Sequence, residues 1–197
     1  MIIWYNFQMR ILLIDNGTKL LDKLKELIPG SEIVHRPGDI SNGDATNFDL
    51  IVLSGSSDLT VMYDGEQFKK EIELILNTQT PLVGICFGCE LIATAFEGTL
   101  KRLEDRHSGI REINIILDDE VLGINKNQSV RVYEGHRWII DKMPEDFKIL
   151  ATSNDGPEII QHNTRPIWGF QFHPENLVDQ TAGDEMFLKL FSKLAQK

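Results

Sequence analysis

Residues 81–96 read PLVGICFGCELIATAF, and this stretch decides the fold. Residues 81–85 form a short apolar run that is typical of a buried strand, and residues 89–96 continue as a helical stretch. The turn between them contains Cys86, with Gly84 before it and Gly88 after it. A strand that passes through a tight turn into a helix is typical of an α/β fold, in which strands and crossover helices alternate.

The sequence before this stretch shows the same alternation of strands and helices. Thr18 is the expected N-cap of a helix that carries leucines on one face and stops at Pro29 and Gly30. A second helix is expected at residues 66–76. Strands are expected at residues 10–14, 32–35 and 49–53. The order predicts an α/β fold with a flavodoxin-like, mostly parallel sheet and helices on both faces.

The second half of the chain is dominated by short β-like runs separated by turns. These runs lie at residues 111–117, 129–133, 148–152, 158–162 and 167–172. They predict a partly antiparallel extension of the sheet. An amphipathic helix is expected at residues 183–195, at the end of the chain. With no internal repeat and no linker, residues 9–197 are predicted to form one domain, preceded by an N-terminal extension at residues 1–8.

Composition excludes several classes of partner. Of the 197 residues, 42% are hydrophobic and 25% are charged, as in globular domains, and the formal net charge is −10. Nucleic acids and anionic membranes both favour clustered Lys and Arg, so neither is expected as a partner. No apolar run approaches the roughly 18 residues that span a bilayer. Residues 1–8 lack a basic start and a cleavage site, and two cysteines make no disulfide framework, so we expect a cytoplasmic protein.

Cys86 is the candidate nucleophile. Gly84-Ile85-Cys86-Phe87-Gly88 is a G-x-C-x-G element between a strand and a helix, which is a nucleophile elbow with sulfur in place of oxygen. The glycines allow a sharp, strained turn, and the N–H groups at the start of the helix favour a thiolate. A buried cysteine beside two turn glycines explains the same residues when they are taken alone.

His173 and Glu175 are candidates for the other two members of a catalytic triad. Gln171-Phe172-His173-Pro174-Glu175 ends an apolar strand, and Pro174 keeps the segment extended, so that both side chains point to one side. A histidine that deprotonates a thiol and a carboxylate that orients the imidazole are the roles that such a triad requires. In isolation, the motif is also compatible with a surface turn.

The segment Ser54-Gly55-Ser56-Ser57 is a candidate oxyanion loop. It follows the strand expected at residues 49–53, and a glycine-containing loop beside the elbow can direct backbone N–H groups at a developing oxyanion. The expected donors are the amides of Gly55 or Ser56 and of Phe87. An ordinary strand-to-helix loop has the same composition.

Taken together, these motifs resemble the class I, or triad, glutamine amidotransferase family over nearly the whole chain. The family's order is an SGG-like loop, here at residues 54–56, then GICxGxQ, here at 84–90, then QFHPE at 171–175. Length and layout resemble most closely the stand-alone amidotransferase subunits of GMP synthase, and Gly135-His136 matches their SH segment. Gly135 and His136 are therefore expected to contact the substrate.

The resemblance implies that Cys86 attacks the side-chain amide of L-glutamine, that His173 relays protons and that Glu175 orients His173. It implies a synthetase partner that receives the ammonia, and no cofactor. Where the family often has His-Gln, this chain has Cys89-Glu90, and Glu90 is expected to face the α-ammonium group of the substrate. The oxyanion loop reads Gly-Ser-Ser where the family often has Gly-Gly-Pro.

Three other interpretations remain open from the sequence. Cys86-Phe87-Gly88-Cys89 is also a C-x-x-C of the kind found in redox proteins. A stand-alone γ-glutamyl hydrolase shares the fold and the triad, and the substitutions at Glu90 and in the loop also fit a catalytically weak regulatory binding partner. The histidines form no H-E-x-x-H motif and no paired Cys/His cluster, so no metal site is predicted. Residues 134–138 are a candidate docking segment, because Arg and Trp are enriched at interfaces.

Overall fold

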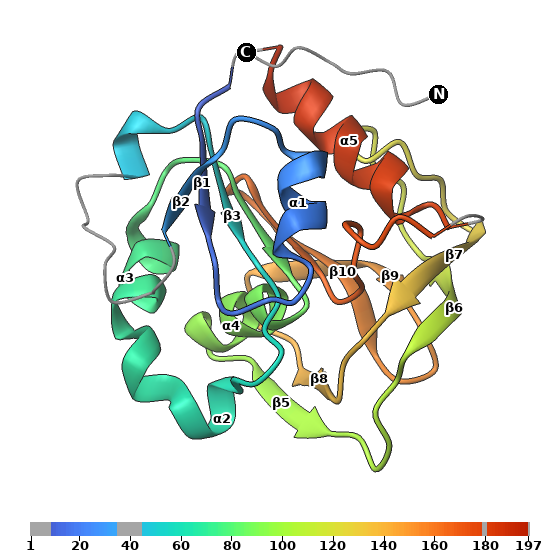
Figure 1. Ribbon diagram of the computed structural model, residues 1–197. Helices are drawn as coiled ribbons and strands as arrows, with labels where there is room; N and C mark the ends of the chain where they lie inside the picture. The colour runs from blue at the N-terminus through green and yellow to red at the C-terminus, as the bar shows by residue number, and fades with distance from the viewer. Residues whose placement is uncertain (1–8, 35–44, 179–180, 197) are drawn as a thin grey trace.

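The computed structural model describes residues 9–34, 45–178 and 181–196. Its first half alternates strands with helices (Figure 1). The strands are β1 (Ile11–Ile14), β2 (Glu32–Val34), β3 (Leu50–Leu53) and β4 (Leu82–Ile85). The helices are α1 (Leu21–Leu27), α2 (Val61–Asp64), α3 (Lys69–Asn77) and α4 (Phe87–Ala95), with single 3-10 turns at Ala45–Asn47 and Gly65–Phe68. No helix in these ranges is long and apolar enough to cross a membrane.

The second half is mainly strands and ends in one long helix (Figure 1). The strands are β5 (Thr99–Arg102), β6 (Gly109–Ile115), β7 (Ser129–Glu134), β8 (Trp138–Lys142), β9 (Phe147–Thr152), β10 (Pro157–His162) and β11 (Ile167–Phe170). The helix is α5 (Gly183–Leu194). All five strands predicted in this half are present, with ends shifted by one or two residues at most places.

Among the described residues, nine strands form one sheet in the order β2-β1-β3-β4-β11-β10-β9-β6-β7. The strands from β2 to β11 pair in parallel, and those from β11 to β7 pair antiparallel. The first four positions have the flavodoxin-like order, and β11 takes the fifth. The predicted fold class is confirmed: a parallel sheet with helices on both faces and an antiparallel extension.

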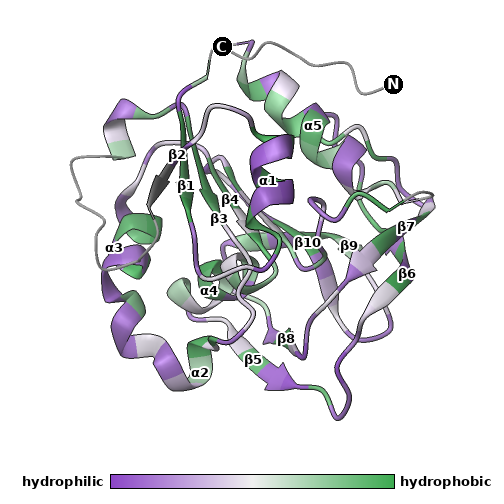
Figure 2. Ribbon diagram, viewed as in Figure 1, coloured by the Kyte–Doolittle hydropathy of each residue, from purple (hydrophilic) through white to green (hydrophobic). Residues whose placement is uncertain are grey.

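The parallel strands are buried on both faces, because side chains alternate along a strand and helices cover each side. In β1, Leu13 packs in one core with α1 and α5, while Leu12 and Ile14 pack in a second core with α3 and α4. Figure 2 shows this as hydrophobic central strands, with polar colours on the outward faces of the helices.

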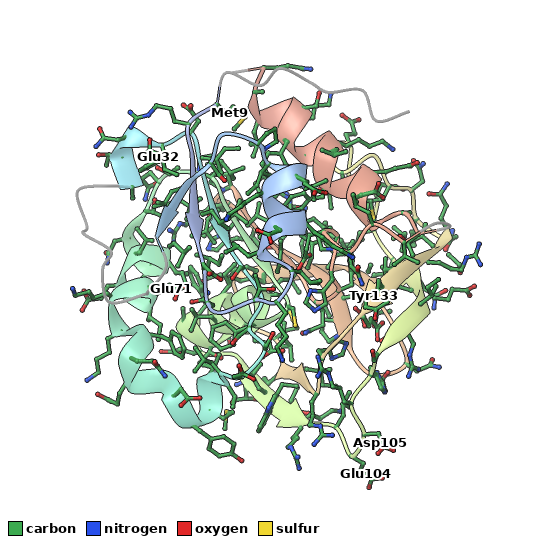
Figure 3. All side chains as sticks on the ribbon, viewed as in Figure 1. Met9, Glu32, Glu71, Glu104, Asp105 and Tyr133 are labelled. Atoms are coloured by element: carbon green, nitrogen blue, oxygen red, sulfur yellow. The ribbon has the colours of Figure 1, made fainter. Side chains whose placement is uncertain are left out.

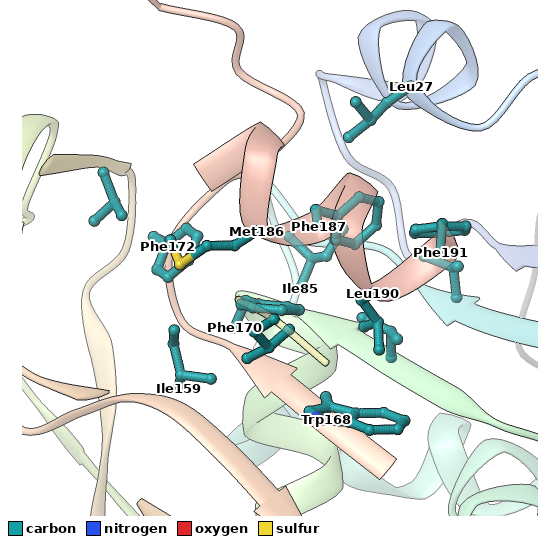
Figure 4. Packing of buried hydrophobic residues seen from close by; sticks show 14 of the residues in the cluster. Leu27, Ile85, Ile159, Trp168, Phe170, Phe172, Met186, Phe187, Leu190 and Phe191 are labelled. Atoms are coloured by element: carbon teal, nitrogen blue, oxygen red, sulfur yellow. The ribbon is translucent and has the colours of Figure 1, made fainter. Parts of the chain in front are cut away.

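Helix α5 closes the first of these cores. Its aromatic residues Phe187 and Phe191 lie 4.6 Å apart between ring centroids, and Phe170 of β11 meets Phe187 edge-on at 5.9 Å (Figure 4). Met186 and Leu190 complete this face of the helix, and all of these side chains are buried. Burial of a large apolar side chain contributes about 1.5–3 kcal/mol, so α5 stabilises the end of β11 that leads into the candidate site.

The structure corrects several local expectations. Thr18 is not the N-cap of α1: the helix begins later, and Thr18 instead accepts a hydrogen bond from the backbone N–H of Leu20. The helix expected at 66–76 divides at Phe68 into a 3-10 turn and α3, because Gly65 interrupts the pattern. Helix α2 and the two-stranded sheet of β5 and β8 were not expected, since they are short and largely polar. The extension predicted at 1–8 lies outside the described residues, and so does His35.

A carboxyl group is buried between α3 and the loop after β1. Glu71 is fully buried, and its Oε1 accepts a hydrogen bond of 3.0 Å from the side-chain amide of Asn16 (Glu71 is labelled in Figure 3). Its second oxygen, Oε2, has no hydrogen-bond partner among the described residues. Burial raises the pKa of Glu71 to about 8, although the bond from Asn16 opposes the rise.

Replacing Glu71 with glutamine is expected to reduce the loss of stability at rising pH. Because the pKa of Glu71 is higher in the folded chain than in the unfolded chain, its contribution is complete below about pH 4.5 and is lost as pH rises towards about 8. The loss is about 1.4 kcal/mol per pH unit within that window. Thermal unfolding from pH 5 to pH 8 should therefore favour Glu71→Gln over the wild type increasingly as pH rises.

The exposed Glu73 on the same helix gives the matched control. Glu73→Gln makes the same charge change and should leave the pH dependence of unfolding as in the wild type. Parallel stability profiles for wild type and Glu71→Gln would contradict the assignment.

Candidate active site

Cys86 lies in a strained turn between β4 and α4. Its backbone has φ 49° and ψ −105°, a conformation that side chains other than glycine rarely adopt. Two backbone bonds hold the turn: the N–H of Cys86 donates to Phe170 O at 2.7 Å, and the N–H of Glu90 donates to Cys86 O at 3.0 Å. The sulfur is thereby placed at the carboxyl end of the central strands, beside the first turn of α4.

The two glycines of the motif allow this close approach. A Cβ on Gly84 would lie 2.5 Å from the carbonyl of Gly88, and a Cβ on Gly88 would lie 2.5 Å from the carbonyl oxygen of Leu53. Both distances are below any real Cβ contact, so a side chain at either position would push α4 away from the sheet. The expectation that the turn needs small neighbours is confirmed.

His173 and Glu175 follow β11 on a segment that is tied to β7. The N–H of His173 donates to Tyr133 O at 2.8 Å, and Nδ1 of His173 lies 2.8 Å from Oε1 of Glu175. Glu175 is fully buried and the His173 side chain is 9% exposed. Because the carboxylate only accepts hydrogen bonds, Nδ1 carries the proton, which leaves Nε2 of His173 for another partner.

That partner is Cys86. A side-chain hydrogen bond joins the thiol to His173. Burial raises the pKa of the Cys86 thiol, while the charge and hydrogen bond of His173 lower it. Burial would lower the pKa of His173, but Cys86 and Glu175 together outweigh it and raise that pKa well above its ordinary value. The three side chains form one hydrogen-bonded chain that favours an imidazolium beside the sulfur.

The candidate oxyanion loop is held by its serine hydroxyls. Ser54 Oγ accepts from the N–H of Asn16 and donates to Gly55 O, both at 2.8 Å. Because the peptide unit is planar, the second bond also sets where the N–H of Ser56 points. Gly55 lies against the other two elements: a Cβ there would be 3.2 Å from the His173 ring and 3.7 Å from Cβ of Cys86.

A cavity of about 310 Å³ opens beside Cys86. It is lined by residues 56–60, Cys86, Phe87, Glu90, Arg106 and 135–138. A smaller hollow, of about 180 Å³, adjoins His173 and shares Ser56, Ser57, Arg106 and Gly135 with it. A larger cavity, of about 370 Å³, lies beyond the end of α4 and contains neither cysteine nor histidine in its lining. The cavity beside Cys86 is therefore the candidate substrate site.

Glu90 stands in the wall of this cavity and is almost fully buried. Its Oε1 accepts a hydrogen bond of 3.1 Å from Nε2 of Gln171. Burial raises the pKa of Glu90 to about 7, although Gln171 and the charge of His173 oppose the rise. Gln171 was not singled out from the sequence, but it alternates with His173 and Glu175, and this spacing is the signal that it faces the same side.

The comparison with known proteins identifies the family. The family model described as glutamine amidotransferase class-I matches residues 12–193. The chain belongs to this family. A separate, glutamine-hydrolysing subunit of GMP synthase from Pyrococcus abyssi is 32% identical to it, over 93% of this chain and 97% of the relative. The amidotransferase is also 33% identical to the GMP synthase of Petrotoga mobilis, over 84% of this chain and 32% of that longer protein.

A solved structure has the same fold. The crystal structure of a Thermoplasma acidophilum protein described as a GMP synthase subunit superimposes with a TM-score of 0.82, covers 96% of both chains and is 24% identical. The amidotransferase is thus a cysteine-dependent, glutamine-hydrolysing enzyme by family, as the sequence predicted. The particular roles of its site residues stay predictions, because no comparison tests them.

Two expected positions lie where direct substrate contact is harder to assign. Gly135 packs on the catalytic histidine candidate: a Cβ there would lie 3.2 Å from Nε2 of His173. His136 borders the cavity, yet its Nδ1 lies 3.1 Å from Trp138 O and its Nε2 lies 3.3 Å from Oε2 of Glu134. Its role in substrate binding stays a prediction, and both ring nitrogens face protein groups.

Cys89 is separated from the cavity by the helix that carries it. It is buried, and a Cβ on Gly169 of β11 would meet its Sγ at 2.6 Å, so the sulfur packs against the sheet. Both cysteines are free thiols. Burial, followed by the charge of Glu90, raises the pKa of Cys89 well above its ordinary value. This thiol lacks the electropositive surroundings of a reactive cysteine, which argues against the redox interpretation.

Cys86→Ala is expected to abolish glutamine hydrolysis while the chain still folds, and Cys89→Ala should retain substantial activity. An electrophilic glutamine analogue should label Cys86 alone, as measured by mass spectrometry of the labelled peptides. Circular dichroism and thermal unfolding of each variant provide the folding control. Equal loss of activity from both substitutions would contradict the assignment of Cys86 as nucleophile.

Proposed function

We propose that this amidotransferase hydrolyses L-glutamine through a thioester on Cys86 and delivers ammonia to a separate synthetase subunit. The observation that supports this most strongly is the hydrogen-bonded chain of Cys86, His173 and Glu175, with the sulfur on a strained turn at the cavity. Two steps follow from the geometry, and each uses His173 once as acid and once as base.

In the first step, the sulfur of Cys86 attacks the side-chain amide carbon of glutamine and its proton passes to His173. His173 returns this proton to the amide nitrogen as the carbon–nitrogen bond breaks, so ammonia leaves and a thioester remains. In the second step, His173 takes a proton from water, whose oxygen attacks the thioester carbon. Glutamate leaves when the carbon–sulfur bond breaks and the thiol regains its proton. Glu175 keeps Nδ1 of His173 protonated throughout.

The oxyanion of each step is proposed to lie between two backbone donors. The N–H of Phe87 is at the first turn of α4, and the N–H of Gly55 or Ser56 belongs to the loop that packs on Cys86 and His173. Such donors act at the charge that develops in the transition state, and loss of one costs about 10²–10³ in rate. The bond from Ser54 Oγ to Gly55 O makes the loop rigid before substrate binds.

Glu90 is proposed to bind the α-ammonium group of glutamine. It lies one turn along α4 from Cys86 and lines the same cavity, where its carboxylate is the charge of the right sign. Gln171 holds Oε1 of Glu90 and so orients the group without neutralising it. The proposed contact also gives a role to the difference between this chain and the GICxGxQ pattern.

The partner is proposed to be the subunit that completes GMP synthase. The Pyrococcus abyssi relative is a separate subunit of about the same length as this chain, whereas in the Petrotoga mobilis GMP synthase the matched stretch is about a third of one longer protein. Of the docking segment at 134–138, Glu134 and His136 are buried, so only Arg137 and Trp138 are available for contact. Trp138 meets the exposed Tyr63 of α2 edge-on at 5.9 Å, beside the cavity.

Glu90→Gln is expected to raise the Michaelis constant for glutamine more than it lowers the turnover number. Because Glu90 has a pKa of about 7, its carboxylate is increasingly ionised as pH rises from 6 to 8. The ratio of the variant's Michaelis constant to that of the wild type should therefore increase over this range. The measurement is glutaminase kinetics at several pH values.

Glu97→Gln, at an exposed position just after the same helix, makes the same charge change and should behave as the wild type. A Michaelis constant that is equal in wild type and Glu90→Gln at every pH would show that Glu90 does not meet the substrate.

Glutaminase activity is expected to be low in the isolated chain and to rise markedly when the synthetase subunit binds. A partner seated on Arg137, Trp138 and Tyr63 covers the mouth of the cavity and excludes water from it. Arg137→Ala should weaken this activation more than it changes the basal rate. Lys126→Ala, at the opposite end of the β6–β7 hairpin, is the control.

The assay measures ammonia release with and without the separately purified synthetase subunit, over a range of its concentration. An isolated chain that turns over glutamine at a normal enzyme rate, with no response to the partner, would favour a stand-alone γ-glutamyl hydrolase. An inactive chain that still binds the partner would favour a regulatory role.

A further inference from the structure

Behind the candidate active site, two histidines and a glutamate converge. His107 precedes β6, Glu134 ends β7, and His136 follows two residues later, next to the position of Tyr133 in Figure 3. One ligand atom from each of the three lies within 4.8 Å of the others. Nδ1 of His107 is 3.5 Å from Oε2 of Glu134, and Nε2 of His136 is 3.3 Å from the same oxygen. The N–H of His107 also donates to His136 O at 2.9 Å, which locks the two segments together.

The converging atoms are buried and lack hydrogen bonds. Glu134 is 1% exposed and His136 is 3% exposed. Within the described residues, neither carboxylate oxygen of Glu134, nor Nε2 of His136, nor Nδ1 of His107 has a hydrogen-bond partner. An unpaired buried polar atom costs about 1–3 kcal/mol, and here four of them face one another. Such an arrangement requires either shared protons or a cation between them.

The backbone determines the tautomer of His136. Its Nδ1 lies 3.1 Å from Trp138 O, and a carbonyl oxygen only accepts hydrogen bonds, so Nδ1 carries a proton. In a neutral ring, Nε2 therefore presents its lone pair to Glu134. A histidine that donates one ring N–H to a backbone carbonyl while the other nitrogen faces a carboxylate is the arrangement seen around protein-bound metal ions.

The charge around the cluster favours a cation. Asp155 lies beside it, with Oδ2 3.2 Å from Nδ1 of His107. Glu158 is buried nearby, and burial followed by the charge of Glu134 raises its pKa to about 8. The half-exposed Arg111 approaches Glu134 only to 4.0 Å, with its Nε. This guanidinium is too distant to balance three carboxyl groups.

We propose that His107, Glu134 and His136 form a binding site for a divalent transition-metal ion of the Zn²⁺ class. With metal–nitrogen and metal–oxygen bonds of about 2.0–2.2 Å, neighbouring ligand atoms of a tetrahedral ion are roughly 3.3–3.5 Å apart. The observed separations of 3.5 and 3.3 Å match this spacing. Asp155, whose side chain is 29% exposed, is the fourth ligand and marks the side from which the ion enters.

The proposed ion would brace the segment that supports the catalytic histidine candidate. Gly135 lies between two of the ligands, and its backbone packs against the ring of His173. No short-range motif indicates this site, because His107 is 27 and 29 residues away from the other two ligands in the sequence. The expectation of no metal site considered only ligands that are close together in the chain.

Titration of the chelator-treated, full-length protein with Co²⁺ and Zn²⁺ tests the proposal. We expect one equivalent to bind per chain, measured by calorimetry and elemental analysis. Bound Co²⁺ should show the visible absorption of a four-coordinate nitrogen and oxygen site, without the thiolate charge-transfer band that binding at Cys86 or Cys89 would produce. His107→Gln and Glu134→Gln should each weaken binding by about tenfold or more.

Zn²⁺ should also raise the thermal unfolding temperature of the wild type, because it binds only the folded chain, and should raise it less in both variants. Glu104→Gln makes the same charge change as Glu134→Gln on the adjacent exposed loop, where Glu104 is labelled in Figure 3, and should bind metal as the wild type does. If Glu134→Gln does not fold, the more exposed His107→Gln carries the comparison.

Three results would each overturn the proposal. These are the absence of saturable binding, equal affinity in the wild type and His107→Gln, and a thiolate band in the Co²⁺ spectrum. In the first case, the cluster is a proton-sharing pair of histidines and carboxylates.

Discussion

The contact between the first turn of α4 and the end of β3 is the constraint on which the site depends. Gly88 lies so close to the Leu53 carbonyl that no side chain fits between them, and Gly84 has the same relation to Gly88. With the helix held this near to the sheet, the chain can pass from β4 into α4 only through a strained residue, and Cys86 is that residue. Its sulfur then has a single direction, towards the segment after β11. The strain, the burial of the thiol and its bond to His173 all follow from this packing.

Buried carboxyl groups differ in how their charge is balanced, and the differences separate their roles. Glu175 has a histidine at 2.8 Å, so it is placed to hold an imidazolium. Glu90 has the neutral amide of Gln171, which leaves its charge available to a cationic group in the cavity. Glu71 has a single amide and no access to the cavity, so its charge brings a cost in stability and no evident gain. A carboxylate at 0–4% exposure is therefore informative only together with the atoms that face it.

Much of the fold and the central site could be predicted because their signals are local. The strand and helix around Cys86 are written in sixteen consecutive residues, and alternation placed His173 and Glu175 on one side. The misses came from weaker or longer-range signals. Strand β5 is mostly polar and exposed, so it lacks an apolar pattern, and Thr18 was misread as an N-cap because it bonds to Leu20 two residues on. The cluster around His107 depends on the pairing of β6 with β7, which no periodicity encodes.

The end of β7 connects these features. Tyr133 accepts a hydrogen bond from the backbone of His173, Glu134 turns into the histidine cluster, and Gly135 packs on the imidazole of His173. A change in charge or coordination at Glu134 therefore reaches the proton relay through two residues of backbone, without a conformational wave through the core. The same segment continues into the exposed Arg137. The position of His173 is thus set from three directions: the strand that carries it, the buried carboxylate behind it and a surface segment that a partner can contact.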